Sequence, residues 1–455
     1  MSITAFPTEL LCEIFAAALP TTDDAKISAH TSPLLVSHVS HEWRHTAIYD
    51  PRLWSTFGVN ITSATHPEHK SLVELFLRRS GSQPLSLSVT TDRFASKRPC
   101  DELQLTRSVL LSLYKESVRW KRLSIVLPSC NGHFIELCNH KAPNLTELSL
   151  KLGSWSEKEA EPINTLLSNA PALSQFTWNN RVSWGSWDVP FDGGLDQLHA
   201  PWPTLTTVVL DAWVSLKTTL DILRQCHSIT SINLRHFANS PEIHEATTSD
   251  TDRYSAPLRL KHLQSLSVYQ LTLDTGLGAL LDRLDCPSLN QFSFACGFIT
   301  QVKWPQPSFH TFIERSECQL ETLSLEFTGI QEAALIQVLK QSTKSLTTLD
   351  VFDARGDICV GDDLLAMIKC RKTEFRKCAT LCPKLRVLKL SHVIDCTNGA
   401  LADVLHSRTF NAVAQHGCSV CVPLLEREIT FSKKFFQSNA SDLRYLAEKR
   451  NGLVG

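Results

Sequence analysis

Three histidines near the amino end of the chain have side chains that could hold a metal ion. His38, His41 and His45 fall at i, i+3 and i+7, which on one helix would bring three imidazoles near the same face. The same positions also fit exposed polar residues, because the intervening Val39 and Trp43 carry the apolar packing of this segment. We favour the second interpretation and predict no metal site here.

Cysteine thiolates near the carboxyl end are the other candidate zinc ligands. Their spacing would suit a zinc ion, and they are Cys370, Cys378, Cys382, Cys418 and Cys421. Cys382-Pro383, however, has the same place in a repeated phrase as Cys286-Pro287, and a small apolar residue that enters a strand explains both. Fifteen scattered cysteines, an odd number without a recognisable secretory signal, indicate reduced thiols. We therefore expect no metal and no other cofactor.

No residue pattern indicates catalysis. The sequence has no phosphate-binding loop, no GxGxxG after a strand and no GxSxG nucleophile elbow. We predict no catalytic residues and no enzyme activity. The formal net charge of -1 gives no reason to expect nucleic acid or an anionic membrane as the partner. No apolar stretch reaches the length of a membrane span, so we expect a cytoplasmic or nuclear protein.

The first fifty or so residues predict short amphipathic helices with more apolar surface than they can bury themselves. Behind Pro7 and Thr8 a helix is predicted whose apolar stripe comprises Leu10, Leu11, Ile14, Phe15, Ala18 and Leu19. A second apolar series at helical spacing comprises Leu35, Val36, Val39, Trp43 and Ala47, and Pro51 then ends the helix before Leu53 and Trp54. So short a segment rarely builds a sufficient core, so part of this surface is expected to meet a partner.

These residues resemble the F-box motif. The match covers roughly residues 5 to 58 and consists of FPTELLCEIF, SPLLVSHVSHEWR and PRLW, with Phe6 in place of the usual Leu and Ser40 where Cys is common. In that family the helices dock on a Skp-type adaptor, which links the protein to a cullin-RING ubiquitin ligase. The resemblance implies that the residues that meet the adaptor or shape its docking face are Phe6, Pro7, Leu10, Leu11, Ile14, Leu35, Val39, Trp43 and Leu53.

A repeated phrase, LxxLxL, runs through the rest of the chain. Each copy forms the last six residues of an eight-residue segment. These segments are residues 143–150, 171–178, 203–210, 227–234, 261–268, 287–294, 318–325, 344–351 and 383–390. A degenerate copy stands at 120–127, and PLSLSV at 84–89 has the pattern of an opening strand. Each copy alternates as a half-buried strand does, and helical patterns such as SLKTTLDILRQC, LGALLDRL, EAALIQVLKQ and GALADVL lie between copies. This periodicity predicts a stack of strand-and-helix units.

Such units resemble the leucine-rich repeat, and together with the F-box they resemble the F-box and leucine-rich-repeat proteins of mushroom-forming fungi. The resemblance implies an α/β fold in which an irregular solenoid carries parallel strands on its concave face and helices outside. The expected domains are a three-helix F-box (1–58), a linker helix (59–84), the leucine-rich-repeat solenoid (85–430) and a C-terminal cap or tail (431–455).

Details within this frame depart from the regular repeat. We expect a helix at residues 71–79 that Gly81 caps before the first strand. The asparagine that usually follows the strand and binds along the backbone is mostly missing, since Trp213, Phe237, Leu271 and Val393 stand in comparable places. The repeat spacing swells near residues 179–202, 236–257 and 297–317, where we expect loops on one rim.

Strand alternation also predicts which residues face the concave side. The outermost residue of each copy is Lys151, Asn179, Asp211, Arg235, Tyr269, Ala295, Glu326, Phe352 or Ser391. Their mixed charge and two aromatic rings suit a protein ligand. The candidate target-binding residues are Arg235, Tyr269, Glu326 and Phe352, together with Trp184 and Trp187 of the polar insertion RVSWGSWDVPFDGG. The alternative, which we favour for the two tryptophans, is that they fold over the repeats as a lid on the core.

The resemblance implies a substrate-recognition subunit of a Skp-cullin-F-box ubiquitin ligase, with the F-box on the adaptor and the repeats on a target protein. The alternative is a scaffold for protein interactions that degrades nothing. An enzyme with a site buried in the repeats would need a motif that the sequence lacks.

Overall fold

The structure is a computed structural model. It describes residues 7–19, 26–62, 65–66, 68–91, 99–127, 140–152, 157–179, 195–238, 256–270, 276–297, 303–355, 358–370, 380–415, 420–431 and 438–451. The chain divides into two compact units. The first comprises Met1–Val214 and Gln225–Ser228, and the second comprises Ser215–Arg224 and Ile229–Gly455.

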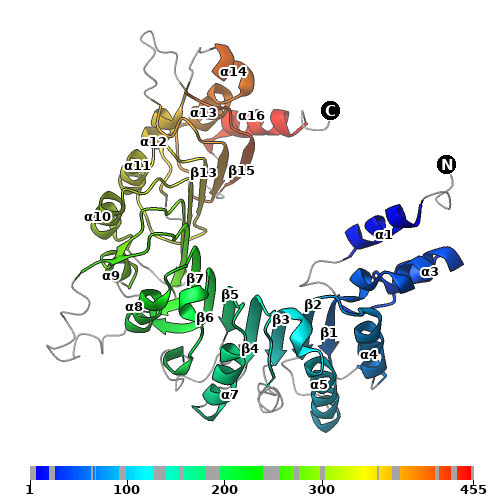
Figure 1. Ribbon diagram of the computed structural model, residues 1–455. Coiled ribbons are helices and arrows are strands. Elements are labelled where there is room, and N and C mark those ends of the chain that lie inside the picture. Colours follow the sequence, from blue (N-terminus) through cyan, green and yellow to red (C-terminus); the bar gives the residue numbers. More distant parts are fainter. Residues whose placement is uncertain are drawn as a thin grey trace. The chain divides into compact units, whose positions relative to one another are not determined.

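Short helices open the first unit (Figure 1). α1 covers Thr8–Ala17, α2 covers Leu34–Ser37, α3 covers His41–Tyr49, and the 3-10 turn η2 covers Pro51–Trp54. The second predicted helix is thus two helices, because the hydroxyl of Ser40 accepts a hydrogen bond from the Trp43 N–H (3.1 Å) and begins α3 anew. The predicted start behind Pro7 and the predicted stop before Pro51 are confirmed.

Parallel strands form the core of the first unit. They are β1 (Thr56–Ile61), β2 (Leu85–Thr91), β3 (Trp120–Leu127), β4 (Glu147–Leu152), β5 (Gln175–Asn179) and β6 (Thr207–Ser215), hydrogen-bonded in that order. Helices α4 (His69–Arg79), α5 (Pro99–Tyr114) and α7 (Glu157–Ser168) lie on one face of them (Figure 1). The short turns η3 (Ser117–Arg119), η4 (Leu195–Gln197) and η5 (Trp202–Thr204) lead toward strands. The sheet begins at Thr56, whereas the sequence places the start of the solenoid at residue 85.

Trp54 joins the N-terminal helices to the sheet. Its side chain is fully buried, its indole N–H donates to the Ala47 carbonyl (2.7 Å), and its ring meets that of Phe76 on α4 at 4.9 Å. The Arg79 guanidinium lies over the same ring, 4.4 Å from its centroid. The helices and the first strands therefore share one apolar core.

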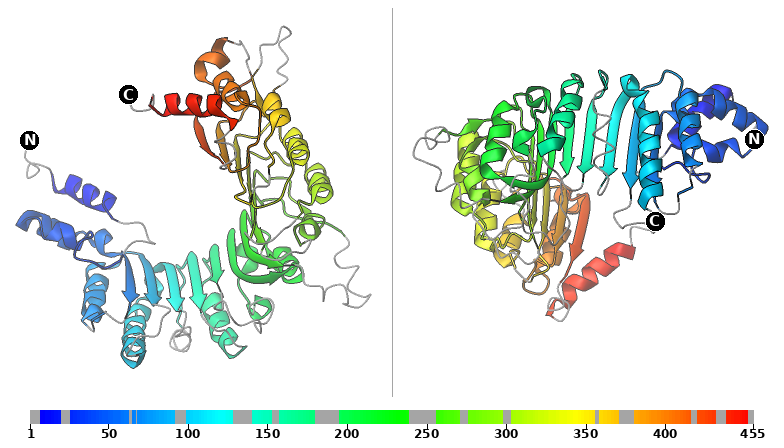
Figure 2. Two further views of the ribbon diagram at one scale, coloured as in Figure 1. Left: turned by 180° about the vertical axis from the view of Figure 1, so that it is seen from behind. Right: turned by 90° about the horizontal axis from the view of Figure 1, so that it is seen from below.

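The second unit repeats the same arrangement (Figures 1 and 2). Its parallel strands are β7 (Ser231–Ala238), β9 (Ser265–Gln270), β11 (Gln291–Cys296), β12 (Thr322–Glu326), β13 (Thr348–Phe352), β14 (Val387–Ser391) and β15 (Glu426–Thr430). Helices α8 (Leu216–Gln225), α9 (Gly276–Leu281), α10 (Gln306–Ser316), α11 (Glu332–Gln341), α12 (Asp362–Ile368) and α13 (Ala400–Ser407) lie on one face. The remaining elements are α14 (Phe410–Gln415), α16 (Ala440–Asn451) and a two-residue ladder of β8 (Leu258–Arg259) with β10 (Leu284–Asp285). The predicted α/β fold with parallel strands and alternating helices is confirmed.

The LxxLxL phrase works as predicted in each copy. In β12, Leu323 and Leu325 are buried while Thr322, Ser324 and Glu326 alternate with them on the other face. The first leucine of the phrase closes a turn at the amino end of the strand: Leu289 N–H donates to the Cys286 carbonyl (3.2 Å), and Leu385 N–H donates to the Cys382 carbonyl (3.1 Å). Both cysteines are buried at this turn, as small apolar residues that precede a strand.

The helices predicted between copies are also present, with one correction. The segments predicted to be helical match α4, α8, α9, α11 and α13, and Gly81 beyond α4 has φ +54°, which suits glycine at a helix end. The loop expected near residues 297–317 is wrong, because α10 occupies most of it. Its buried Phe309, Phe312 and Ile313 recur at i, i+3 and i+4 and form an apolar stripe. Most of the other two swollen segments lies outside the described residues.

Backbone hydrogen bonds join neighbouring strands at their carboxyl ends, where the resemblance to leucine-rich repeats predicts an asparagine side chain. The N–H groups of Phe327, Asp353 and His392, each directly after a strand, donate to the carbonyls of Phe352, Ser391 and Thr430 at 2.9 to 3.0 Å. Phe327 and His392 have positive φ (53° and 63°), which turns their peptide groups toward the neighbouring strand. The strands in this part of the second unit therefore satisfy each other's backbone without an asparagine side chain.

Carboxylates tie neighbouring helices together. Glu332 on α11 accepts from the N–H groups of Gly361 (2.9 Å) and Leu364 (2.8 Å), at the amino end of α12. The buried Asp442 on α16 accepts from Gly399 (2.7 Å) and Ala402 (2.6 Å), at the amino end of α13. Negative charge at a helix amino end is favourable. Each carboxylate therefore caps one helix and also holds the helix that carries it against that neighbour.

Candidate functional site

Four apolar side chains of the N-terminal helices are exposed to solvent. Leu10 and Ile14, one turn apart on α1, are 50% and 48% exposed, and Leu35 on α2 and Val39 just after it are 47% and 58% exposed. Both helices pack against α3. All four belong to the residues that the F-box resemblance assigns to the adaptor. Large apolar side chains that stay exposed on two short helices suit a protein partner.

The other residues of the predicted adaptor set have different positions. Leu11 and Leu53 are buried, and Trp43 is half-buried with its ring 4.9 Å from that of Phe15. These three hold the helices together, so their effect on a partner would be indirect. Pro7 is exposed at the start of α1, and Phe6 lies outside the described residues.

A polar cluster fixes the junction between α1 and η2. The Arg52 guanidinium donates to Glu13 (2.8 Å) on α1 and to the buried Asp50 (2.9 Å). Burial alone would raise the pKa of Asp50, but the hydrogen bonds and charge of Arg52 outweigh it and hold that pKa below its usual value. Burial and the neighbouring Asp50 raise the pKa of the Cys12 thiol, which leaves it protonated at neutral pH. This cluster is structural.

A second candidate surface is the face of the second unit's strands that its helices leave open, here called the open strand face. The strand register aligns Arg235, Tyr269, Ala295, Glu326, Phe352 and Ser391 in one row across β7, β9, β11, β12, β13 and β14. Arg235 and Glu326 are exposed, and Tyr269 and Phe352 are half-buried. The pairing places four of the candidate target-binding residues in this row. Trp184 and Trp187 lie outside the described residues.

In the first unit the corresponding row is different. Asn179 and Asp211, expected to face the concave side, are buried and hydrogen-bonded to each other, with Asn179 Nδ2 donating to Asp211 Oδ2 at 2.6 Å. A hollow of about 230 Å³ on β2 to β5 is lined mainly by Ser88, Ser124, Ser149 and Thr177 and by the ion pair of Arg122 with Glu147 (3.1 Å). The side chains that line this part of the strand surface are mostly small, and its two charged groups neutralise each other.

An aromatic cluster borders the open strand face where β12, β13 and β14 end. The Phe352 ring meets Phe327 edge-on at 4.9 Å and His392 at 6.1 Å. The Arg355 guanidinium lies 5.4 Å from the centre of the Phe327 ring and pairs with Asp353 (2.7 Å). The sequence singled out only Phe352 of this cluster. The other members follow the strands, where period-two alternation no longer tells which way a side chain points.

Negatively charged side chains predominate on the part of the open strand face that β12 to β15 form. Asp350 lies diagonal to Glu326 across β12 and β13, and Lys389 on β14 pairs with Glu426 (2.7 Å) and Glu428 (3.4 Å) on β15. Partial burial raises the pKa of Glu326, and the charge of Asp350 raises it further. Partial burial also raises the pKa of Asp350, although Lys389 opposes the shift. Neither carboxylate has an ion-pair partner among the described residues.

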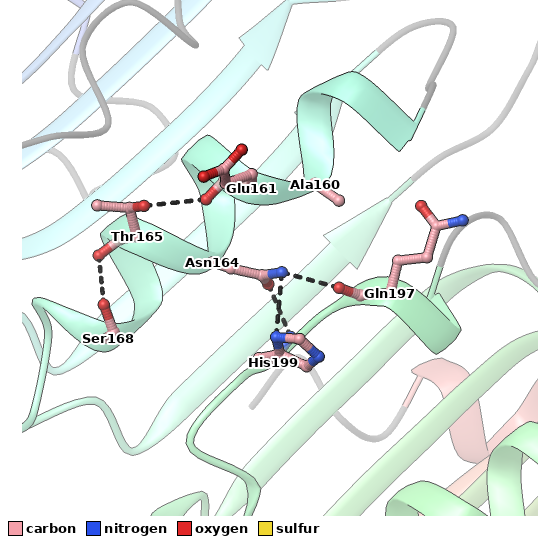
Figure 3. A pocket seen from close by; sticks show the side chains of 7 residues that line it. All are labelled: Ala160, Glu161, Asn164, Thr165, Ser168, Gln197 and His199. Atoms are coloured by element: carbon pink, nitrogen blue, oxygen red, sulfur yellow. Dashed lines mark hydrogen bonds between the residues drawn. The ribbon is translucent and has the colours of Figure 1, made fainter.

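A shallow groove on α7 has a structural explanation (Figure 3). It measures about 580 Å³ and is lined by Ala160, Glu161, Asn164, Thr165, Ser168, Gln197 and His199. Asn164 Nδ2 donates to the Gln197 carbonyl (2.8 Å), and its Oδ1 accepts from the His199 N–H (2.7 Å). Asn164 therefore ties the segment after η4 to the helix. These contacts account for the polar groups without a ligand.

The histidines and cysteines considered as metal ligands do not converge in the parts of the chain that the structure describes. His38, His41 and His45 are exposed, and there no group of three or more His, Cys, Asp or Glu side chains could hold a metal ion. Burial raises the pKa of Cys382 to about 12, so its thiol stays protonated. Cys370 and Cys421 pack together with Val413, while Cys378 and Cys418 lie outside the described residues. No helix within the described ranges is long and apolar enough to cross a membrane.

Comparison with known proteins gives a distant structural likeness. No family model matches the chain, and no curated protein matches it. Among solved structures, a chain of the crystal structure of the Rad7 and Elc1 complex in yeast is similar over 84% of this chain and 88% of that chain. The sequence identity is 15% and the TM-score is 0.42.

Proposed function

We propose that this protein is the substrate-recognition subunit of a Skp-cullin-F-box ubiquitin ligase. Its N-terminal helices bind a Skp-type adaptor, and the open strand face of its repeats binds a target protein. Catalysis is then positional: the receptor raises the concentration of target lysines near ubiquitin that other subunits carry, and it needs no nucleophile of its own.

One observation supports the adaptor site above others. Leu10, Ile14, Leu35 and Val39 stay exposed at the positions where the F-box resemblance expects adaptor contacts. Their neighbours Leu11 and Leu53 are buried, so the segment is a folded structure that displays these side chains. Since Leu10, Ile14 and Leu35 are about half exposed, burial of their remaining surface against a partner would contribute roughly 1 kcal/mol each.

Adaptor binding tests the proposal directly. We predict that Leu10→Asp abolishes co-purification of a Skp-type adaptor, because it places a charge at the centre of the apolar contact, where truncation of a central residue alone costs about 2 kcal/mol or more. The matched control is Val118→Asp, since Val118 is 56% exposed on η3, far along the sequence from these helices. Both substitutions are at exposed positions and should leave thermal unfolding unchanged.

The outcome also separates the ligase from the scaffold. Recovery of adaptor together with cullin from the parent chain, and of neither from Leu10→Asp, supports the ligase. Recovery of adaptor without cullin would favour the scaffold that degrades nothing. Equal recovery of adaptor from the parent and from Leu10→Asp, at matched expression, would refute the assignment of the N-terminal helices.

A further inference from the structure

We propose that the carboxyl ends of β12, β13 and β14 bind a basic, extended segment of the target, with a Lys or Arg side chain between Glu326 and Asp350 and against the Phe352 ring. This inference rests on the proposed function, since it gives the chemistry of the target that the open strand face would take. It names a polypeptide rich in Lys or Arg as the occupant.

Charge complementarity is the first argument for this occupant. The open face of β12 to β15 carries Glu326, Asp350, Glu426 and Glu428 against one lysine, Lys389, which already pairs with both glutamates of β15. Glu326 and Asp350 have no ion-pair partner among the described residues, although Lys389 stands opposite Asp350 in the strand register and its charge reaches that carboxylate. The exposed cations Lys384 and Arg386 precede β14, at the opposite end of the strands.

Partial desolvation makes this charge costly in the free protein. Neighbouring atoms remove water from both carboxylates without supplying a hydrogen bond to either side chain in the described part of the chain, and the two charges repel each other. An incoming ammonium or guanidinium group would relieve both penalties at once. A negatively charged ligand would increase the repulsion and the desolvation penalty. An acidic peptide or a nucleic acid is therefore excluded by the same reasoning.

The aromatic cluster is the second, independent argument. Phe352 stays half-buried beside Glu326 in the strand register, so part of its ring remains open to a ligand. The neighbouring Phe327 already has a guanidinium, that of Arg355, 5.4 Å from its ring centre. This internal contact shows that the rings of the cluster can accept a planar cation, and a cation beside both a ring and carboxylates is held from two sides.

Strand geometry favours an extended segment that crosses the strands. Neighbouring strands lie about 4.8 Å apart, and an extended chain rises about 3.3 Å per residue with side chains alternating in direction. A segment that crosses from β14 to β12 would therefore place one side chain near Glu326 and Asp350 and direct the next away from the sheet. Basic residues at alternate positions of such a segment would therefore all point toward the sheet.

Peptide binding to the purified full chain tests the inference. The probe is a fluorescent peptide of alternating Arg and Ser, and the comparison probe has Gln in place of each Arg. We expect the Arg peptide to bind and the Gln peptide not to bind, and we expect Glu326→Gln combined with Asp350→Asn to weaken the Arg peptide by about tenfold or more. Phe352→Leu, which keeps apolar bulk but removes the ring face, should weaken it by a few fold.

The matched control is Glu147→Gln. Glu147 is on the strand surface of the first unit, where it pairs with Arg122, and its substitution changes the net charge in the same direction as either test substitution. It should bind the Arg peptide as the parent does. The double variant loses two partly buried carboxylates that have no ion-pair partner among the described residues, so it should unfold at the same temperature as the parent or higher.

Equal binding of the Arg peptide to the parent and to the double variant would overturn the inference, as would failure of the parent to bind it at low salt. Loss of binding in Glu147→Gln to the same degree would indicate general charge attraction and would overturn it as well. Adaptor co-purification from the same preparations separates the two proposals, because it depends on Leu10 and not on Glu326 or Asp350. Retained adaptor with no peptide binding counts against this inference alone.

Discussion

At the scale of single residues, the carboxylates of the open strand face predict an unusual pH dependence. The pKa values of Glu326 and Asp350 lie above the usual range, so both groups take up protons at a higher pH than ordinary surface carboxylates do. We predict that binding of the Arg peptide weakens as the pH falls through these raised values, because arginine stays charged while its partners become neutral. Fluorescence anisotropy over a series of pH values measures the effect.

A fall in pH affects stability in the opposite direction from peptide binding. A carboxyl group with a raised pKa in the folded state binds protons more tightly there, so protonation of Glu326 and Asp350 stabilises the fold. Thermal unfolding followed in parallel should therefore show no loss of stability from these groups where binding is lost. The other charged groups near them are Lys389, Glu426 and Glu428, together with the Asp353–Arg355 pair. An unchanged pH profile in the variant with Glu326→Gln and Asp350→Asn would contradict this account.

Residue-level prediction from sequence succeeded where alternation applies and stopped where it ends. Period two placed Tyr269, Glu326 and Phe352 in one row, and the register agrees. It also placed Asn179 and Asp211 on the open side, although both are buried, because a side-chain hydrogen bond between neighbouring strands compensates their polarity. Phe327 and His392 lie in positive-φ turns after the strands, where no periodicity gives direction.

At the scale of elements, the Glu332 carboxylate predicts a coupled effect on α12. A Cβ atom at Gly361 would lie 2.6 Å from the carboxylate that caps this helix, so glycine is needed for the cap and not for its backbone angle. We predict that Glu332→Ala and Gly361→Ala each destabilise the chain by about 1–2 kcal/mol. The double variant should lose little more than either single variant, because both changes remove the same two hydrogen bonds.

Hydrogen exchange locates the effect and supplies the control. Protection of the Leu364 amide, which donates to Glu332 at 2.8 Å, should fall in both single variants. Glu74→Ala on α4 removes only an exposed pair with Lys70 (3.6 Å) and should cost about 0.5 kcal/mol or less, with no change at Leu364. Fully additive losses in the double variant would show that the cap and the glycine act separately.

Which elements the sequence could predict follows from how strongly each one repeats. Strands with the LxxLxL phrase were found because three buried leucines fix both position and direction. β1 and β15 lack the phrase: β15 reads EREIT, with glutamates in register with Val387 and Lys389 of β14, and its outer edge meets no further strand in the described chain. The wide spacing of the repeated phrase predicts a loop where α10 lies, since spacing alone does not distinguish a loop from an additional helix.

At the scale of the whole molecule, the N-terminal helices are not a detachable module. Trp54 is buried against Phe76, and the Ile27 N–H donates to the Gly58 carbonyl (3.0 Å) at the edge of β1. Deletion of residues 1–58 would remove part of β1 and expose this core. We predict that the deletion lowers hydrogen-exchange protection of β2, whereas Leu10→Asp with Ile14→Asp leaves β2 protected. Equal protection in both would show that the helices fold apart from the sheet.

Point variants are therefore the better means of separating the two activities, and each proposed site belongs to a different compact unit. We predict that proximity labelling with Leu10→Asp and Ile14→Asp loses adaptor and cullin but keeps the targets, because the open strand face is untouched. Labelling with Glu326→Gln, Asp350→Asn and Phe352→Ala should keep adaptor and cullin and lose targets that carry basic segments. In a ligase, loss of either contact means that target lysines are no longer held near the ubiquitin that the other subunits carry. Target proteins should therefore accumulate with both variants. A target whose level rises with neither variant, although it is labelled by the parent chain, is held by a scaffold and not degraded.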